Sequence, residues 1–292
     1  MRKFFLFLFL FFFSSALFSL EVNIIEKHPA NGKSTLLLFN KEKGTILQDV
    51  RYGRKRFPIF SDPDNAQYSY ALIPFSYYTK LGKKVLYIDY IQHKKHKRES
   101  LFIEVVSGGY KKEEIHVSAS KVNPRSKQVQ KRISKEYSEA MRIYHTITLK
   151  SYIHKPFILP LHSKITSNFG KARIYNGSLK GYHSGTDFRA KVGTPIIAAN
   201  DGRVVLVKKR FYSGGTVIVD HGEGIYTCYF HMSHFDVQKG TIVHRGQKLG
   251  LSGQSGRVTG PHLHFAARVD GVQVDPLQLI KLLNNNLLKE KN

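Results

Sequence analysis

The sequence predicts a mainly β protein with a minor helical component, in which a small amino-terminal α+β region precedes an antiparallel β-sheet domain. The chain has 292 residues and is 41% hydrophobic, so it can bury a core. Segments rich in β-branched and aromatic residues recur along its whole length. In the second half they are separated by glycine turns with no strong helix between them, which indicates an antiparallel sheet or a small barrel.

Residues 1–20 differ in composition from the rest of the chain. A short basic stretch precedes an almost purely apolar run from Phe4 to Phe13, and small residues follow it. This pattern predicts a secretory signal peptide, with Ala16 and Ser19 as alternative last residues, and therefore a periplasmic or secreted protein. The alternative is an uncleaved anchor associated with the inner membrane, because residues 4–20 are uncharged and reach the short end of the range that spans a bilayer.

Cysteine content and charge limit the partners of the protein. Cys228 is the only cysteine, so no internal disulfide forms, and its apolar surroundings predict a buried small hydrophobe. The net charge of +25 is spread over both halves and would concentrate the protein on a polyanion. Export argues against nucleic acid and favours an anionic wall polymer or a membrane surface. The basic run at residues 93–98 is predicted to be a solvated loop or strand edge.

Residues 21–150 are predicted to form the amino-terminal α+β region. An amphipathic helix is expected over residues 126–147, with Ile133, Tyr137 and Tyr144 on its apolar face. A turn cluster near residues 53–65 can divide the region into two small modules. The predicted strands are 35–39, 67–73, 85–91, 101–106 and 114–117.

Residues 151–157 are predicted to be a linker, and residues 158–280 to form the β-sheet domain. Pro156 and Pro160 act as breakers near the boundary. Residues 281–292 are predicted to form a terminal segment. A short helix is predicted over residues 276–288, so it overlaps the start of this segment. The predicted strands of the domain are 194–198, 202–207, 215–220, 225–231, 248–251 and 263–269.

Two histidines, His262 and His264, lie two residues apart in one predicted strand. Both rings point to the same face, because side chains alternate along a strand. Upstream, His183 and Asp187 supply another imidazole and a carboxylate. Two histidines and an aspartate form a three-ligand set for catalytic zinc with a fourth position open for water, and the extra histidine can transfer protons. The pattern predicts a metal hydrolase, with either His262 or His264 as the ligand.

The segment from His183 to Asp187 is predicted to be a strand or a bulge. Its spacing of four residues would also suit a helix, but Gly185 and Thr186 argue against one. Glycine at this position allows the backbone to approach the metal site closely.

These motifs resemble those of the M23 zinc metallopeptidases, the lysostaphin and LytM type that cut peptide bonds in bacterial peptidoglycan. The H-x-G-x-D motif appears as His183 to Asp187, and the H-x-H motif as His262 and His264. The intervening Y-x-H motif appears as Tyr229 to His231. The similarity covers about residues 158–276. Matching segments are Ile165 to Gly170, Gly193 to Pro195, Asp201-Gly202, His221 to Gly224, and the glycines at 253, 256 and 260.

The resemblance implies that His183, Asp187 and His264 bind one zinc ion per chain, while His231 and His262 are catalytic. It implies an antiparallel LytM-like catalytic domain that hydrolyses stem peptides or cross-links of peptidoglycan. In a Gram-negative envelope the D-alanyl–diaminopimelate cross-link is the expected target, and cutting it would affect cell shape. Because no H-E-x-x-H motif is present, no glutamate base of that type is expected.

A second hypothesis is a catalytically silent M23-like activator of a cell-wall amidase. Such proteins have lost zinc ligands, whereas this chain keeps the whole set. One departure from the family pattern is Ala266, where members often carry an acidic residue. His221, His234 and His244 are predicted to be surface or structural histidines.

The first half resembles, more weakly, the amino-terminal modules of exported Gram-negative M23 proteins, through residues 109–133. Such modules can cover the active-site groove and keep the enzyme latent. The resemblance therefore implies an inhibitory role for residues 21–150, in which an Asn, Glu or His would occupy the open metal position. It does not identify that residue or the oligomeric state.

Overall fold

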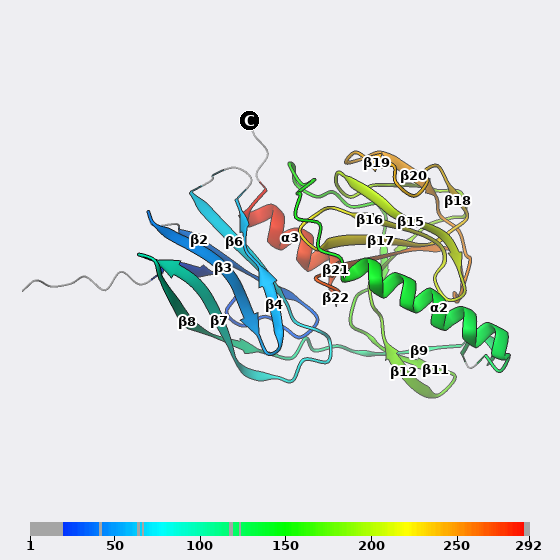
Figure 1. Ribbon diagram of the computed structural model, residues 1–292. Helices are drawn as coiled ribbons and strands as arrows, with labels where there is room; N and C mark the ends of the chain where they lie inside the picture. Colours follow the sequence, from blue (N-terminus) through cyan, green and yellow to red (C-terminus); the bar gives the residue numbers. More distant parts are fainter. Residues whose placement is uncertain are drawn as a thin grey trace, which may run out of the picture.

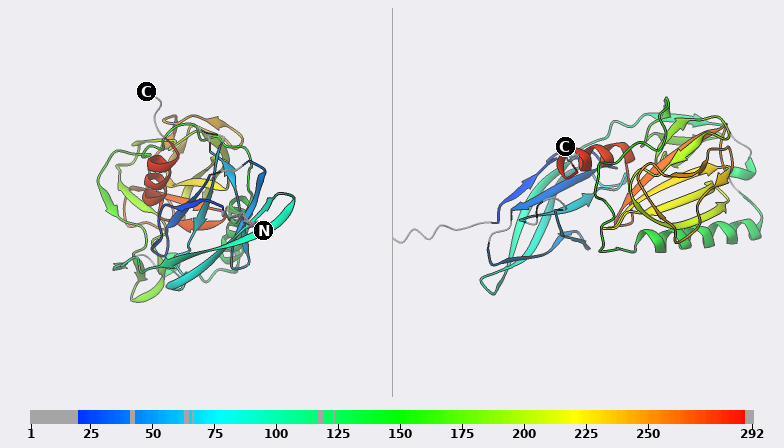
Figure 2. Two further views of the ribbon diagram at one scale, coloured as in Figure 1. Left: turned by 90° about the vertical axis from the view of Figure 1, so that its left-hand side faces the viewer. Right: turned by 90° about the horizontal axis from the view of Figure 1, so that it is seen from above.

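The chain folds into two lobes that lie side by side (Figures 1 and 2). The computed structural model describes residues 20–40, 43–62, 65, 67–116, 119–122 and 124–288. Its predominance of antiparallel strands confirms the predicted fold class. The predicted signal peptide or anchor lies, apart from Leu20, outside the described residues. Within the described part of the chain, no helix is long and apolar enough to cross a membrane.

The amino-terminal lobe contains β1 to β8. One sheet has the order β1-β2-β6-β5 and the other the order β4-β3-β7-β8. Their apolar faces share one core, to which Phe39 of β2, Val50 of β3 and Ile88 of β7 contribute. The strands are β1 (Val22–Ile24), β2 (Ser34–Asn40), β3 (Thr45–Tyr52), β4 (Lys55–Pro58), β5 (Phe60–Ser61), β6 (Tyr68–Pro74), β7 (Gly82–Gln92) and β8 (Lys95–Val105).

The basic run at residues 93–98 forms the exposed end of the β7–β8 hairpin. His93 and Lys94 make the turn, with φ angles of 51° and 61°, and the rest of the run starts β8. The prediction of a solvated edge is therefore confirmed.

The carboxy-terminal lobe is built on a long sheet with the order β10-β13-β21-β17-β16-β15-β19, and β22 pairs with β21. Smaller sheets, β12-β11-β9 and β14-β20-β18, flank it. Its strands are β9 (Lys112–Ile115), β10 (Ile165–Ser167), β11 (Ala172–Tyr175), β12 (Ser178–Tyr182), β13 (Thr186–Arg189), β14 (Pro195–Ile197), β15 (Gly202–Arg210), β16 (Gly214–Asp220), β17 (Ile225–Met232), β18 (His234–Phe235), β19 (Ile242–Val243), β20 (Lys248–Leu251), β21 (His262–Val269) and β22 (Val272–Val274).

Strand β9 comes from the predicted amino-terminal region but pairs in parallel with β11 of the other lobe. Residues 106–111 connect it to β8, and Figure 1 shows the chain passing here from one lobe to the other. The strand predicted at 114–117 is thus found at 112–115, and residue 117 lies outside the described residues. The short helix α1 (Ala119–Val122) comes next.

Helix α2 (Lys127–Tyr144) covers one face of the long sheet. Ser126 caps it by accepting a hydrogen bond from the Val129 N–H. Ala140 and Tyr144 pack against the sheet, where the buried Cys228 lies, as predicted. Burial raises the pKa of the Cys228 thiol to about 11.

The prediction for this helix was wrong in two respects. It ends three residues before 147, because the Tyr226 hydroxyl holds the Thr146 carbonyl at 2.6 Å and the chain turns away. Tyr137 is 63% exposed, whereas the charged Glu136 is buried. Glu136 is stabilised by Arg132 Nε at 2.7 Å and by the Phe211 N–H at 2.8 Å.

Helix α3 (Pro276–Asn286) connects the two lobes. Asp275 caps it, and Leu279 and Leu283 are buried in the core of the carboxy-terminal lobe. The Gln278 side chain donates to the Ser34 carbonyl of β2 at 2.8 Å. Because Leu36, Tyr70 and Leu72 also belong to this core, the lobes share buried surface. The domain boundaries near residues 150, 157 and 280 stay predictions.

Asp270, in the turn between β21 and β22, makes the stability of the protein depend on pH. Burial raises the pKa of its carboxyl to about 7 from 3.8, and its Oδ1 atom has no hydrogen-bond partner within the described residues. Between these values the native state binds more protons than the unfolded state, so the free energy of unfolding falls as pH rises.

We expect Asp270→Asn to remove this dependence. The advantage of the variant over the wild type in free energy of unfolding should grow by roughly 3 kcal/mol between pH 5 and pH 8, since one pKa unit corresponds to about 1.4 kcal/mol. Urea denaturation at the two pH values measures it. A constant difference between the proteins would show that Asp270 ionises normally.

Candidate metal centre

Neighbouring strands of the long sheet bring the predicted site residues together. Strands β13 and β21 are antiparallel, and Asp187 lies directly opposite His264. His262 and His264 project from the same face of β21, as their spacing predicts. On the other side of β21, β17 places Phe230 opposite His264 and carries His231 next to it.

Three ligand atoms converge at this point. The His183 Nε2 atom lies 2.9 Å from Asp187 Oδ1 and 3.0 Å from His264 Nδ1, and His264 Nδ1 lies 2.8 Å from Asp187 Oδ1. All three residues are buried. Within the described residues, this is the group of His, Cys, Asp and Glu side chains that could hold a metal ion.

Gly185 allows the His183 loop to approach the strand that carries His264. A Cβ atom at this position would lie 2.4 Å from the Phe265 carbonyl oxygen and 2.6 Å from His264 Nε2. Any larger residue would therefore push His264 or the loop away from the site. The close backbone approach predicted from the sequence is confirmed.

Hydrogen bonds fix the proton position on His183. Its Nδ1 lies 2.8 Å from the Asn168 carbonyl oxygen, which can only accept, so Nδ1 carries the proton of the neutral ring. The Nε2 lone pair then faces the Asp187 carboxylate, an arrangement that only a cation or a proton between them can stabilise. Burial lowers the pKa of His264 to about 4, so this ring is neutral near pH 7 and carries one proton.

The Asp187 carboxylate is held in its ionised form. Burial by itself would raise the pKa of Asp187, but a ring N–H donated to it, as from His264 Nδ1 at 2.8 Å, holds the pKa well below the ordinary range. An ionised carboxylate and two neutral imidazole rings are ligands that suit a divalent cation such as zinc.

His231 and His262 present free ring nitrogens beside this cluster. His231 Nδ1 donates to the Ser255 carbonyl at 2.8 Å, and His262 Nδ1 donates to the Gly260 carbonyl at 2.9 Å. In the neutral rings the Nε2 atoms are therefore left as acceptors. Burial, followed by the nearby His264 and His262 rings, lowers the pKa of His231 to about 3, so that it is uncharged at neutral pH.

His231 adopts a left-handed backbone conformation, with φ of 63°. Such a conformation is uncommon for a residue other than glycine and has to be held by its surroundings. Here the His231 N–H donates to the Ser213 carbonyl at 2.9 Å, and the ring is anchored on Ser255. The ring centroid lies 4.8 Å from that of His262.

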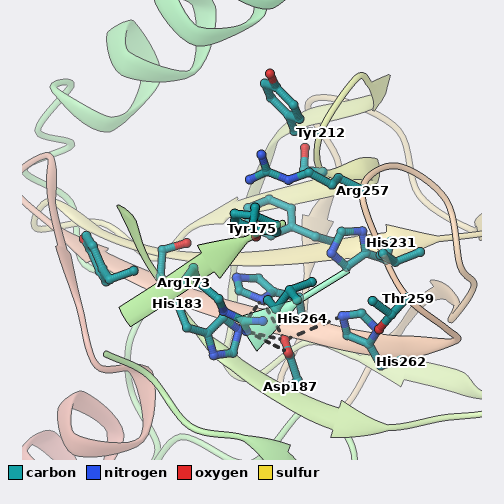
Figure 3. A pocket seen from close by; sticks show the side chains of 16 residues that line it. Arg173, Tyr175, His183, Asp187, Tyr212, His231, Arg257, Thr259, His262 and His264 are labelled. Carbon is teal, nitrogen blue, oxygen red and sulfur yellow. Dashed lines mark hydrogen bonds and ion pairs between the residues drawn. The ribbon is translucent and has the colours of Figure 1, made fainter. Parts of the chain in front are cut away.

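All five predicted side chains line one pocket of about 200 Å³ (Figure 3). The pocket is partly open, and its remaining lining comes from β9 of the predicted amino-terminal region and from residues 173–259. Ile115 of β9 lies at one side, with Arg173 and Arg257 as its basic residues. The prediction that a residue of 21–150 blocks the open metal position stays a prediction.

The other histidines lie away from the ligand cluster. His221 is fully buried, with Nδ1 donating to the Asp201 carbonyl at 2.6 Å and Nε2 lying 2.7 Å from the Thr227 hydroxyl oxygen. His234 and His244 have side chains that are 62% and 77% exposed. Ala266, the departure from the family pattern, packs against α2 and not into the pocket.

Sequence reasoning missed two arginines and a glutamate near the pocket. Arg173 NH2 lies 3.4 Å from Asp187 Oδ2, and its NH1 lies 2.9 Å from Glu113 Oε2. Arg257 lies against two tyrosine rings. Only the chain fold brings Glu113 to this place, so its sequence context carries no signal. Arg257 directly follows Gly256, and in the sequence only the glycine matches the family pattern.

Comparison with known proteins agrees with this geometry. Residues 181–276 match the family described as Peptidase family M23. Two proteins of Vibrio cholerae serotype O1 are similar: peptidoglycan DD-endopeptidase ShyA, 43% identical over 122 residues, and ShyB, 37% identical over 130 residues. These matches cover 41% and 43% of this chain, but only 28% and 30% of the relatives.

A solved structure resembles the chain over more of its length. The crystal structure of a candidate M23 peptidase from Pseudomonas aeruginosa superposes with a TM-score of 0.67 at 26% identity, over 87% of this chain and 96% of that one. The shared fold thus includes most of the amino-terminal lobe. Together with the family match and the clustered motif residues, it identifies residues 181–276, within the carboxy-terminal lobe, as a peptidase family M23 domain.

Proposed function

We propose that the protein is a zinc-dependent endopeptidase that hydrolyses peptide cross-links of peptidoglycan, with the D-alanyl–diaminopimelate bond as its target. The observation that carries this proposal is the convergence of His183 Nε2, Asp187 Oδ1 and His264 Nδ1, with two further histidines on the same pocket. The similarity to proteins named peptidoglycan DD-endopeptidases supports the substrate class.

The proposed metal ligands are His183, Asp187 and His264. Two neutral imidazoles and an ionised carboxylate suit zinc, and three protein ligands leave a position open for water. When bound, zinc would supply Lewis acidity for a water molecule and for the carbonyl of the scissile bond.

His231 is proposed as the proton carrier. Its Nε2 accepts a proton from the attacking water as the new C–O bond forms at the carbonyl carbon. The same ring then donates that proton to the leaving nitrogen as the C–N bond breaks. The hydrogen bond from Nδ1 to the Ser255 carbonyl keeps the ring in the orientation and tautomer that this transfer needs.

His262 is proposed to orient the water and the reacting carbonyl. Its Nε2 faces the ligand cluster, 3.6 Å from Asp187 Oδ1, and its side chain is 17% exposed, at the mouth of the pocket. The Gly260 carbonyl fixes its tautomer in the same way. A ring held in this position restricts the water to directions from which it can attack.

A catalytically silent amidase activator is the less favoured candidate. It would be expected to have lost part of the ligand or proton-transfer set. The five residues His183, Asp187, His231, His262 and His264 instead line one pocket.

The predicted signal segment and the net charge of +25 support action in the cell envelope. An exported protein of this charge would be retained near an anionic wall polymer or membrane surface. Loosening of cross-links at this location would contribute to wall remodelling and cell shape.

Digestion of isolated sacculi and of a defined cross-linked muropeptide dimer tests the proposal. Mass spectrometry should find the dimer converted to monomers by hydrolysis of the D-alanyl–diaminopimelate amide. Release of whole stem peptides from the glycan only when an amidase is added would instead support the activator. Intact dimers under all conditions would contradict the proposal.

A further inference from the structure

The positively charged side chain of Arg257 lines the pocket and is stacked between two tyrosine rings. The Arg257 guanidinium carbon lies 4.4 Å from the ring centroid of Tyr175 and 4.5 Å from that of Tyr212. Figure 3 shows the side chain between the two tyrosines, above the ligand cluster. The Arg257 backbone N–H also donates to the Tyr212 backbone carbonyl at 2.8 Å, which holds the two residues together.

Arg257 has no acidic partner within the described part of the chain, in contrast to Arg173, which contacts Glu113 and Asp187. Stacking on two aromatic faces stabilises the cation but leaves the edge of the guanidinium, with its N–H donors, unsatisfied. The planar edge of a guanidinium matches a carboxylate, with which it forms two parallel hydrogen bonds.

We propose that Arg257 forms a carboxylate subsite, which selects stem peptides that carry a free carboxylate near the scissile bond. This inference rests on the proposed function, because it names what the same pocket recognises. A cross-linked peptide carries two carboxylates with the required chemistry. One belongs to the diamino acid whose amine forms the cross-link, and the other is the carboxyl terminus of the peptide.

Three synthetic dimers test the subsite and distinguish these sources. One has both carboxylates free, the second is amidated at the diamino acid, and the third is amidated at the carboxyl terminus. A hydrogen-bonded ionic contact of this kind corresponds to a factor of about 10 to 100 in kcat/KM. We expect one of the amidations to lower kcat/KM by about this factor in the wild type, and by less than about twofold in Arg257→Gln.

Matched variants separate the subsite from general electrostatics. Arg257→Lys should discriminate less than the wild type, because lysine lacks the planar fork and does not stack. Arg189→Gln removes an exposed positive charge at the edge of the neighbouring groove and should discriminate like the wild type. Tyr212→Phe keeps the ring face and should also discriminate, whereas Tyr212→Leu should not.

The dissociation constants of the metal-depleted protein for the same three peptides give a readout without turnover. If the wild type binds but cleaves none of them, the proposed function fails, and the ratio of affinities still decides the role of Arg257. Equal affinity and equal cleavage of all three peptides would overturn the subsite. So would discrimination that persists in Arg257→Gln.

A second inference concerns Glu113, which the amino-terminal part of the chain places beside the ligand cluster. Strand β9 runs parallel to β11 with Glu113 opposite Arg173. The Glu113 carboxylate contacts Arg173 NH1 at 2.9 Å, Lys171 Nζ at 3.0 Å and the Ser167 hydroxyl at 3.1 Å. The same arginine reaches Asp187 Oδ2 through NH2 at 3.4 Å.

We infer that Glu113 is a positioning residue for the metal ligand Asp187 and acts through Arg173. Glu113 holds the guanidinium in one orientation and balances its charge, which would otherwise repel a metal cation. The Arg173 side chain is only 13% exposed, so solvent screens that charge weakly. Groups that orient metal ligands typically contribute about 10- to 100-fold to metal affinity.

Competition with a chromogenic chelator measures the zinc dissociation constant of each variant. We expect Glu113→Gln to weaken zinc binding about tenfold. Glu114→Gln, on the next residue of the same strand, should change it less than about twofold, because the exposed carboxylate of Glu114 forms a 3.8 Å ion pair with the exposed His116.

The double variant Glu113→Gln/Arg173→Gln distinguishes charge balance from a general structural effect. Removing the unpaired positive charge should restore most of the lost zinc affinity. Zinc binding by Glu113→Gln that equals the wild type, or a double variant that binds more weakly than the single variant, would overturn the inference.

Discussion

Replacement of His264 by alanine is expected to abolish both metal binding and hydrolysis. His264 Nδ1 lies within 3.0 Å of the ligand atoms of His183 and Asp187, and two remaining ligands would hold zinc far less tightly. Zinc content measured by mass spectrometry should fall from about one per chain to less than about 0.1. Cleavage of a cross-linked dimer should fall by a factor of about 10³ or more.

His234→Ala is the matched control for this variant. His234 is exposed and pairs with Asp236 at 3.1 Å, away from the ligand cluster. It should keep both zinc and activity. Circular dichroism of the His264→Ala protein should show an unchanged fold. A variant at His264 that keeps a full equivalent of zinc would show that the ligand set is different.

Replacement of His231 or His262 by alanine is expected to lower turnover but leave zinc binding intact. Neither side chain belongs to the three-residue cluster, so zinc should stay bound at about one equivalent. Turnover should fall by about 10²- to 10⁴-fold, the usual contribution of a positioned general acid–base group. Zinc content and kcat, measured on the same preparation, separate the two classes of variant.

His244→Ala provides the control, because its side chain is 77% exposed. Loss of zinc from His231→Ala would contradict the division of roles between ligands and proton-transfer groups. A turnover unchanged in both variants would contradict it equally, since the pocket would then use neither ring.

The prediction of the carboxy-terminal lobe from sequence succeeded because its signals are local. Runs rich in apolar and β-branched residues between glycine turns mark strands such as β16 and β21, and period-two alternation places His262 and His264 on one face. The glycine at position 185 likewise predicts a close backbone approach, because a side chain would not fit there.

What the sequence could not reveal depends on tertiary contacts. Glu136 is buried because Arg132 and the Phe211 N–H satisfy its carboxylate, and Phe211 is far away in sequence. Glu113 and Arg173 meet because a strand from the first half pairs with β11. Strand β3 was missed because the charged Asp49 and Arg51, which form ion pairs across the sheet, interrupt its apolar pattern.

The amino-terminal part of the chain contributes to the pocket. The resemblance to latency modules implies that it inhibits the site, and that stays a prediction. The amino-terminal part also helps to build the pocket, because Glu113 contacts Arg173 and Ile115 forms part of the lining. Since Leu36 and Tyr70 belong to the core of the other lobe, point variants are better tests than truncation.

Titration of the metal-depleted protein with zinc, followed by cleavage of the cross-linked dimer, tests the central claim most directly. The rate should rise linearly with added zinc and level off at about one equivalent per chain, because one three-ligand cluster holds the metal. Full activity without metal, or one tightly bound zinc ion with no cleavage of the dimer, would contradict it.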